Sequence, residues 1–404
     1  MASSRSWWQP PALHQPGEAA RRVTFLELFY DLVFVVVIAR LAHHLAAHPD
    51  LGGLRDFVLL FVPTWWVWVS GTYYNERFET YDLSFRFFIF LQILAVAGMA
   101  ATVEQAANGA VVGFTLAYVF ARLIIVVMWA RAAHHNPQVK PVTNIYLLGF
   151  GISIALWLIS LALPPLPGLL LRGLGLLIEI ATPMLTFRAQ ARVFRASANK
   201  LPERLGLFVI IVLGEALVGV INGFGDVEGY DWPTLLRFLS GLMVGFLLWW
   251  NYFDFVGRRE PMSGPGKTWV LARWIYLHLP LLLGLTAIGA MLEHTIGVAE
   301  VGGEEVRGAS EAAVGWILAG AFSLVYVCLA ALDSTLEREE IRLLSVSQTV
   351  LMRLGTAAAA LALPLLHFSP VGVALGLVAL QSLNAFVGAR AWFASAHAGR
   401  TDVH

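Results

Sequence analysis

The residues of this chain that could carry chemistry are carboxylic acids inside apolar stretches. Glu27 and Asp31 are four residues apart, so they share one face of a helix. Glu215 stands in a second apolar run far along the chain. If the two helices begin near residues 23 and 205, Asp31 and Glu215 lie ~12 and ~15 Å from their starts. Both depths are close to the middle of a ~30 Å hydrocarbon layer.

A charged side chain at the centre of a bilayer costs at least ~2.5–3.5 kcal/mol, so it usually faces the bundle interior or a transport pathway. Two carboxyl groups that meet there can share and release a proton. The sequence therefore predicts Asp31, Glu215 and Glu27 as proton- or cation-coupling residues. The competing interpretation is that each acid pairs with a buried arginine as a packing contact. Four arginines lie in apolar runs: Arg40, Arg122, Arg273 and Arg353.

Other polar and aromatic side chains form three candidate groups. Stacked aromatic rings at mid-span can line a cavity for an apolar or cationic solute. The predicted cavity residues are Trp65, Trp66, His278, Asn222, Trp249 and Trp250. The predicted cytoplasmic gate, or interfacial cluster, comprises Glu203, Arg204, Asn251 and Asp254. The predicted outer mouth comprises Glu104, Glu293 and His294. For each group the alternative is ordinary packing or a solvated helix end. The trio Arg40, His43 and His44 is interpreted as an interfacial polar cap.

Metal and cofactor chemistry has little support in the sequence. The single cysteine, Cys328, allows neither an internal disulfide nor a thiolate zinc site. Metalloprotease spacing, a glycine-rich phosphate loop and a serine hydrolase elbow are absent, and no histidine spacing selects a haem site. The 27 basic and 27 acidic residues balance, which argues against binding to nucleic acid. We expect no metal, no cofactor and no nucleic-acid partner.

The elements that position these residues are membrane helices. Of the 404 residues, 58% are apolar and 13% charged, about half the usual charged share. This composition predicts an all-α, polytopic membrane protein whose partner is the lipid bilayer. Twelve spans of ~20 residues are predicted, with ten or eleven as alternatives. Their ranges are 24–46, 54–74, 84–104, 110–131, 142–163, 168–189, 204–224, 233–254, 270–294, 311–332, 347–366 and 370–393.

The distribution of Lys and Arg predicts the orientation. With twelve spans and a cytoplasmic N-terminus, nineteen of these residues fall on the cytoplasmic side. Four fall on the other side: Arg55, Arg172, Arg237 and Arg307. This bias is typical of cytoplasmic loops, and it predicts an inner-membrane protein with both termini in the cytoplasm.

Two halves of the chain show a similar order of motifs. The acid and apolar run at Asp31 corresponds to the run at Glu215, and Trp65-Trp66 corresponds to Trp249-Trp250 at the same offset of about 184 residues. Six spans in each half would form a parallel repeat. The predicted organisation is a cytoplasmic tail 1–22, a first half 23–196, a second half 197–395 and a cytoplasmic tail 396–404.

Several motifs resemble those of a known family. They are the run from Glu27 to Val35, the run from Glu203 to Glu215, Trp249-Trp250-Asn251-Tyr252-Phe253-Asp254 and His278-Leu279-Pro280. Together they are similar to the bacterial low temperature requirement protein A (LtrA) family, over about residues 20–395. Lys200 stands where a His is common in the family, which puts any role of that His in doubt. The resemblance implies the membrane architecture and a phenotype in the cold, and it names no reaction.

Three functions are compatible with these features. The first is a secondary, proton-coupled transporter or permease for a small solute. The second is an integral membrane enzyme acting on a lipid or isoprenoid, with Glu27, Asp31, Glu215 and His278 as acid–base groups. The third is a non-catalytic membrane protein that supports growth in the cold. Transport is the preferred prediction, and it is preferred over an enzymatic function.

Overall fold

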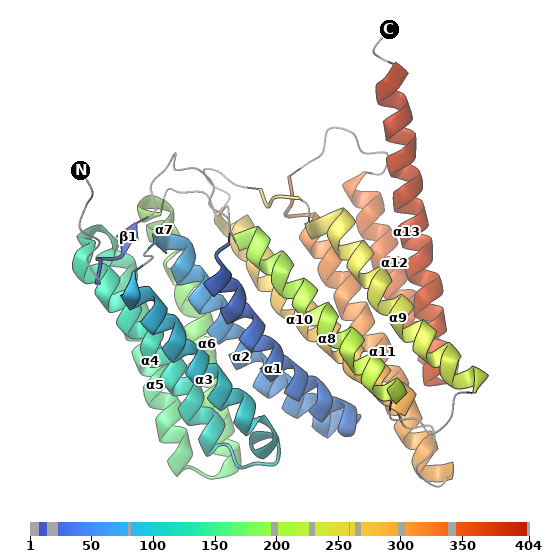
Figure 1. Ribbon diagram of the computed structural model, residues 1–404, viewed down its shortest axis with the longest axis horizontal. Helices are drawn as coiled ribbons and strands as arrows, with labels where there is room; N and C mark the ends of the chain where they lie inside the picture. Colours follow the sequence, from blue (N-terminus) through green and yellow to red (C-terminus); the bar gives the residue numbers. More distant parts are fainter. Residues whose placement is uncertain are drawn as a thin grey trace. The chain divides into compact units, whose positions relative to one another are not determined.

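The computed structural model of the protein is almost entirely helical (Figure 1). It describes residues 8–13, 23–79, 82–194, 201–225, 231–257, 259–262, 268–297, 304–337 and 345–401. The α-helices are α1 (Phe25–Ala47), α2 (Leu51–Arg77), α3 (Leu83–Ala107), α4 (Val112–His135), α5 (Lys140–Ile159), α6 (Pro165–Leu185), α7 (Phe187–Val193), α8 (Leu201–Gly225), α9 (Trp232–Tyr252), α10 (Thr268–Gly297), α11 (Glu304–Asp333), α12 (Val346–Leu365) and α13 (Pro370–Thr401). The short elements are β1 (Ala12–Leu13), β2 (Phe78–Glu79), η1 (Pro137–Val139), η2 (Ser160–Ala162) and the π-helical turn η3 (Phe253–Gly257).

Ten helices in the described part of the chain are long and apolar enough to cross a membrane. They are α3–α6 and α8–α13, and they match the last ten predicted spans. The range 168–189 is among them as α6, although Glu179 and Pro183 interrupt its apolar run. The first two predicted ranges also form helices, α1 and α2, of 23 and 27 residues. The all-α membrane architecture is therefore confirmed, while the count of twelve spans and the repeat stay predictions.

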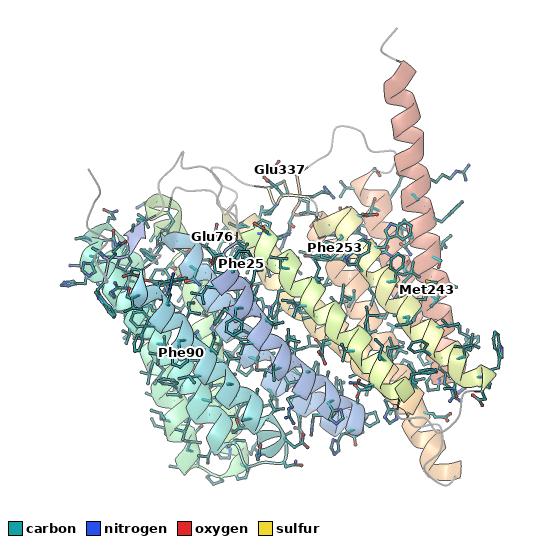
Figure 2. The ribbon with its side chains drawn as sticks, viewed as in Figure 1. Phe25, Glu76, Phe90, Met243, Phe253 and Glu337 are labelled. Carbon is teal, nitrogen blue, oxygen red and sulfur yellow. The ribbon has the colours of Figure 1, made fainter. Side chains whose placement is uncertain are left out.

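The outer faces of these helices carry large apolar side chains. Phe90 of α3 is 54% exposed and Met243 of α9 is 45% exposed, and both are labelled in Figure 2. Leu177 of α6 and Leu351 of α12 are exposed in the same way. Large apolar side chains exposed on so many helices are rare on soluble monomers, whereas lipid tails cover them in a bilayer.

The chain divides into two compact units. Unit 1 comprises Met1–Leu41 and Val58–Leu205, and unit 2 comprises Ala42–Phe57 and Gly206–His404. In unit 1, α3, α4, α5 and α6 pack on one another in chain order (Figure 1). In unit 2, α11 packs on both α10 and α12, and α13 packs on α9. The division at residues 205 and 206 falls inside α8.

The N-terminal segment is held on unit 1 by specific contacts. Strand β1 pairs with β2, and the Arg131 guanidinium donates to the Gln9 carbonyl and lies 4.8 Å from the centre of the Trp8 ring. Asp82 caps α3 by accepting from the Phe85 amide, and it also accepts from the Gln9 amide. The Asp82 carboxylate is therefore the shared anchor of α3 and of the segment before β1.

This anchor predicts a pH dependence of the N-terminal contact. Burial raises the pKa of Asp82, but the amides of Gln9 and Phe85, the Ser84 hydroxyl and Arg131 together lower the pKa below its ordinary value. The stabilisation is therefore fully present above about pH 4, the pKa of an unfolded Asp, and is lost as the pH falls through the folded value. Amide hydrogen exchange should show that Asp82→Asn reduces protection of Gln9 at neutral pH.

The matched control is Asp231→Asn. Asp231 caps α9 in the same way, with its carboxylate accepting from the Thr234 amide, but it belongs to unit 2. This variant should leave the protection of Gln9 unchanged. Equal protection of Gln9 in the wild type and in Asp82→Asn at neutral pH would contradict the anchor.

Glycines allow close helix packing in unit 2. A Cβ on Gly289 of α10 would lie 2.6 Å from the Cβ of Ala216 on α8. A Cβ on Gly223 of α8 would lie 2.7 Å from the carbonyl oxygen of Glu293 on α10. Small residues of this kind let helix backbones approach closely in membranes. This contact fixes which side chains of α8 and α10 meet.

Candidate functional site

The first buried ion pair joins Asp31 of α1 to Arg204 of α8, within unit 1. Arg204 Nη2 donates to Asp31 Oδ1, and Arg204 Nε donates to Asp31 Oδ2 over 3.4 Å. Trp68 of α2 donates from its ring nitrogen to the same Oδ1 over 2.8 Å. The side chains of Asp31 and Arg204 are 0% and 1% exposed. Arg204, predicted in the cytoplasmic gate, is instead the partner of Asp31.

The start of α1 explains the position of Glu27 and Asp31. Thr24 and Glu27 form a reciprocal cap, in which Glu27 Oε2 accepts from the Thr24 amide over 2.9 Å and the Glu27 amide donates to the Thr24 hydroxyl over 3.2 Å. The helix therefore begins at Phe25, and Asp31 lies ~9 Å along it rather than the ~12 Å expected. Glu27, a predicted coupling residue, has its carboxylate occupied by this cap.

A second buried ion pair, also in unit 1, was not predicted. Arg122 Nε of α4 lies 2.8 Å from Glu179 Oε2 of α6, and both side chains are fully buried. Tyr118, one turn before Arg122, donates its hydroxyl to the same carboxylate oxygen over 2.9 Å. The Arg122 guanidinium also lies 4.5 Å from the centre of the Phe150 ring on α5. The signal in the sequence was a pair of opposite charges, each near the middle of its own apolar span.

Unit 2 contains a carboxylate cluster in which the ion pair joins a glutamate to a histidine. Glu293 Oε1 of α10 lies 3.2 Å from His43 Nδ1 near the end of α1. A Cβ on Gly219 of α8 would lie 3.0 Å from Glu293 Oε2. Glu215 is one turn before Gly219 on the same helix face, is partly buried, and lies within electrostatic range of Glu293. The structure thus brings together Glu215, the mouth residue Glu293 and the cap residue His43.

The predicted cavity residues have different surroundings. His278 of α10 is fully buried, with Nδ1 2.8 Å from the Trp274 carbonyl and Nε2 3.0 Å from the Tyr252 hydroxyl, so both ring nitrogens have protein partners. Trp65 and Trp66 of α2 are buried in unit 1, with ring centres 6.1 Å apart. In unit 2, Trp249 is partly exposed beside Phe246, Trp250 is partly buried, and Asn222 is exposed.

The remaining gate and mouth candidates are also spread over both units. Glu203 is exposed in the first turn of α8, whereas Asn251 is buried and donates to the Leu247 carbonyl. Asp254 lies in the π-helical turn η3. Glu104 is exposed near the end of α3 in unit 1, and His294 contacts the Ala46 carbonyl in unit 2. Lys200, at the position where the family commonly has His, lies outside the described residues.

Metal ligation has no candidate in the part of the chain that the structure describes, because no three His, Cys, Asp or Glu side chains group there as ligands. Cys328 is buried in α11. The chemistry available at the described sites is therefore that of carboxylates, guanidinium groups, imidazoles and phenols. The absence of a cofactor stays an expectation.

Membrane-length helices with apolar outer faces define this chain as a multi-pass membrane protein. Residues 22–382 match the family described as bacterial low temperature requirement A protein (LtrA), and the chain belongs to that family. Among its relatives is uncharacterized protein RA0937 of Rhizobium meliloti (strain 1021). It is 26% identical over 305 residues, which cover 72% of this chain and 73% of that protein. The family description names no reaction, so the function has to be argued from the site.

Proposed function

We propose that the protein is a proton-coupled secondary transporter of a small solute, and that Glu215 and Glu293 carry the coupling proton. The single observation behind this proposal is the approach of the two glutamates in unit 2. Gly219 lacks a side chain, which lets the Glu293 carboxylate lie against α8 one turn from Glu215. Two carboxylates that approach each other inside a membrane are relieved of repulsion when they take up a proton.

The nature of the ionic partners separates these glutamates from the other buried acids. Asp31 and Glu179 are paired with arginines, whose guanidinium groups stay charged at every physiological pH. Glu293 is paired with His43, and histidine changes charge between about pH 5 and pH 8. Protons can therefore enter and leave the Glu215–Glu293–His43 cluster without the loss of a permanent ion pair.

The position of His43 supports an entry route for the proton. Its side chain is 74% exposed, whereas that of Glu293 is 18% exposed, so the imidazole connects a partly buried carboxylate with the surface of unit 2. His43 and Glu293 both lie near the C-terminal ends of their helices. In this proposal, His43 passes the proton to Glu293, which shares it with Glu215.

The Lys and Arg distribution supports a placement in the bacterial inner membrane with both termini in the cytoplasm. The ends of α1 and α10 would then face outward, so the proton enters from outside. This direction is the one in which a bacterial proton gradient drives uptake of a solute.

A solute screen in proteoliposomes tests the proposed function. Purified protein is reconstituted with a pH-sensitive dye in the lumen, a pH gradient is imposed, and small solutes are added one at a time. We expect at least one solute to accelerate dissipation of the gradient, with no acceleration in protein-free liposomes. Solute entry that proceeds at the same rate with and without the gradient, and moves no proton, would contradict coupling.

A further inference from the structure

The Arg122–Glu179 pair of unit 1 is surrounded by polar atoms that lack partners. In the described part of the chain, Arg122 Nη1 and Nη2, Glu179 Oε1, Ser153 Oγ and the Trp157 ring nitrogen are buried without a hydrogen bond. The side chains belong to α4, α5 and α6, and each is at most 4% exposed. Unpartnered buried polar groups are costly, so a cluster of five such atoms indicates an additional bound group.

Contacts among α4, α5 and α6 place these side chains in the same region of unit 1. Ser153 and Trp157 are one turn apart on α5, and Phe150, which contacts the Arg122 guanidinium, is one turn before Ser153. A Cβ on Gly175 of α6 would lie 3.1 Å from Ser153 Oγ and 3.2 Å from the Trp157 ring nitrogen.

Gly175 is also one turn before Glu179, and the missing side chain lets α6 pack closely against Ser153 and Trp157 beside the ion pair. Trp157 is in turn held by stacking on Tyr118, with ring centres 4.1 Å apart. Because Tyr118 also bonds to Glu179, the ring nitrogen of Trp157 has a fixed place relative to the ion pair.

The balance of donors and acceptors identifies the missing group. Both terminal nitrogens of Arg122, the Trp157 ring nitrogen and the Ser153 hydroxyl can donate, whereas Glu179 Oε1 is the one unpartnered group of this set that only accepts. An excess of donors around a guanidinium suits an anion.

We infer that the Arg122 cluster binds a small monovalent anion, and that the anion replaces Glu179 on Arg122 while Glu179 takes up one proton. The guanidinium and the carboxylate sum to zero charge before binding. The guanidinium, the anion and the protonated carboxyl also sum to zero afterwards, so no net charge is added to the buried site. The binding of this anion does not depend on the proposed function.

The groups that face Glu179 are compatible with this exchange. From α4 they are Arg122 and Tyr118, and from α5 they are the non-titrating side chains Ser153 and Trp157. Tyr30 of α1 lies within electrostatic range of Arg122 and also of the Asp31–Arg204 pair. The permanent cation nearest to Glu179 is thus Arg122, the residue for which the carboxylate and the anion compete.

Titration calorimetry of the purified full-length protein tests the inference, with chloride, bromide and formate as probes in a gluconate buffer. Repeating the titration in buffers of different ionisation enthalpy counts the protons. We expect one anion per chain, uptake of close to one proton, and an affinity that falls about tenfold for each unit of rising pH. The wild type binding none of the three probes, or binding without proton uptake, would overturn the inference.

Variants assign the binding to these residues. Arg122→Gln should abolish binding, and Glu179→Gln should bind the anion without proton uptake or pH dependence. Trp157→Phe keeps an aromatic side chain and removes the ring N–H donor, so it should weaken binding about tenfold even if Arg122→Gln fails to fold. Arg273→Gln, at an exposed arginine of α10, is the control and should bind as the wild type does. Unchanged affinity in Trp157→Phe together with pH-dependent binding by Glu179→Gln would place the anion elsewhere.

This experiment and the flux experiment fail independently. Anion binding with proton uptake in a protein that moves no solute would support the site and contradict transport. Proton-coupled flux of a solute in a protein that binds no anion would support transport and contradict this site.

Discussion

Glu215→Gln is expected to abolish proton-driven accumulation of the solute. The variant should still let the solute cross the membrane down its own gradient. A glutamine cannot take up a proton, so the solute would then equilibrate instead of being concentrated. One pH unit is worth about 1.36 kcal/mol per proton, or about tenfold accumulation for one proton per solute. The wild type should approach this ratio, and Glu215→Gln should reduce it to about one. Uptake into proteoliposomes under a pH gradient measures the ratio.

Two further variants make this test specific. Glu293→Gln should reduce accumulation as well, because it removes the second carboxylate of the cluster and the partner of His43. Glu311→Gln changes an exposed glutamate near the start of α11 and should accumulate solute as the wild type does. Full accumulation by a correctly folded Glu215→Gln protein would show that the proton is carried elsewhere.

Asp31→Asn is expected to destabilise the protein by about 3–5 kcal/mol, because it leaves the buried Arg204 guanidinium without its counter-ion. The double replacement Asp31→Leu with Arg204→Met removes both charges. It should recover most of the lost free energy of unfolding, because apolar side chains need no counter-ion in a buried site. Denaturant-induced unfolding in detergent micelles compares the two variants with the wild type.

The exposed Arg55–Asp56 pair provides the matched control. Its charged atoms are 2.8 Å apart, but the Arg55 side chain is 67% exposed. Asp56→Asn should therefore change the free energy of unfolding by only about 0–1 kcal/mol. Equal effects of Asp31→Asn and Asp56→Asn would mean that the Asp31–Arg204 pair contributes no more than a surface contact does.

The helices could be predicted from the sequence because their signal is local. Runs of ~20 apolar residues located the ranges of α3–α6 and α8–α13, including α6 with its internal Glu179 and Pro183. The start of α1 was also readable, since Thr24 and Glu27 have the spacing of a capping box. A helix start at residue 23 in place of Phe25 puts Asp31 about two residues too far along the helix.

The partners of the buried charges could not be predicted in the same way. Arg204 lies 173 residues from Asp31 in the chain, and hydrophobic periodicity does not say which helices pack together. The sequence alone predicts Arg204 in a cytoplasmic gate or interfacial cluster with Glu203. The Glu293–His43 contact could not be predicted for the same reason, because it joins α10 to α1 across 250 residues. Glycines such as Gly219 allow such contacts, but they can be recognised in this role only when the helix packing is known.

The most direct test of the account is whether a solute gradient by itself moves protons through Glu215. Proteoliposomes with equal internal and external pH receive the solute identified in the screen on the outside only, and the luminal pH is recorded. We expect the lumen of wild-type vesicles to acidify as solute enters, and vesicles with Glu215→Gln to take up solute down its gradient without acidification. Solute entry into wild-type vesicles at constant luminal pH would contradict the account.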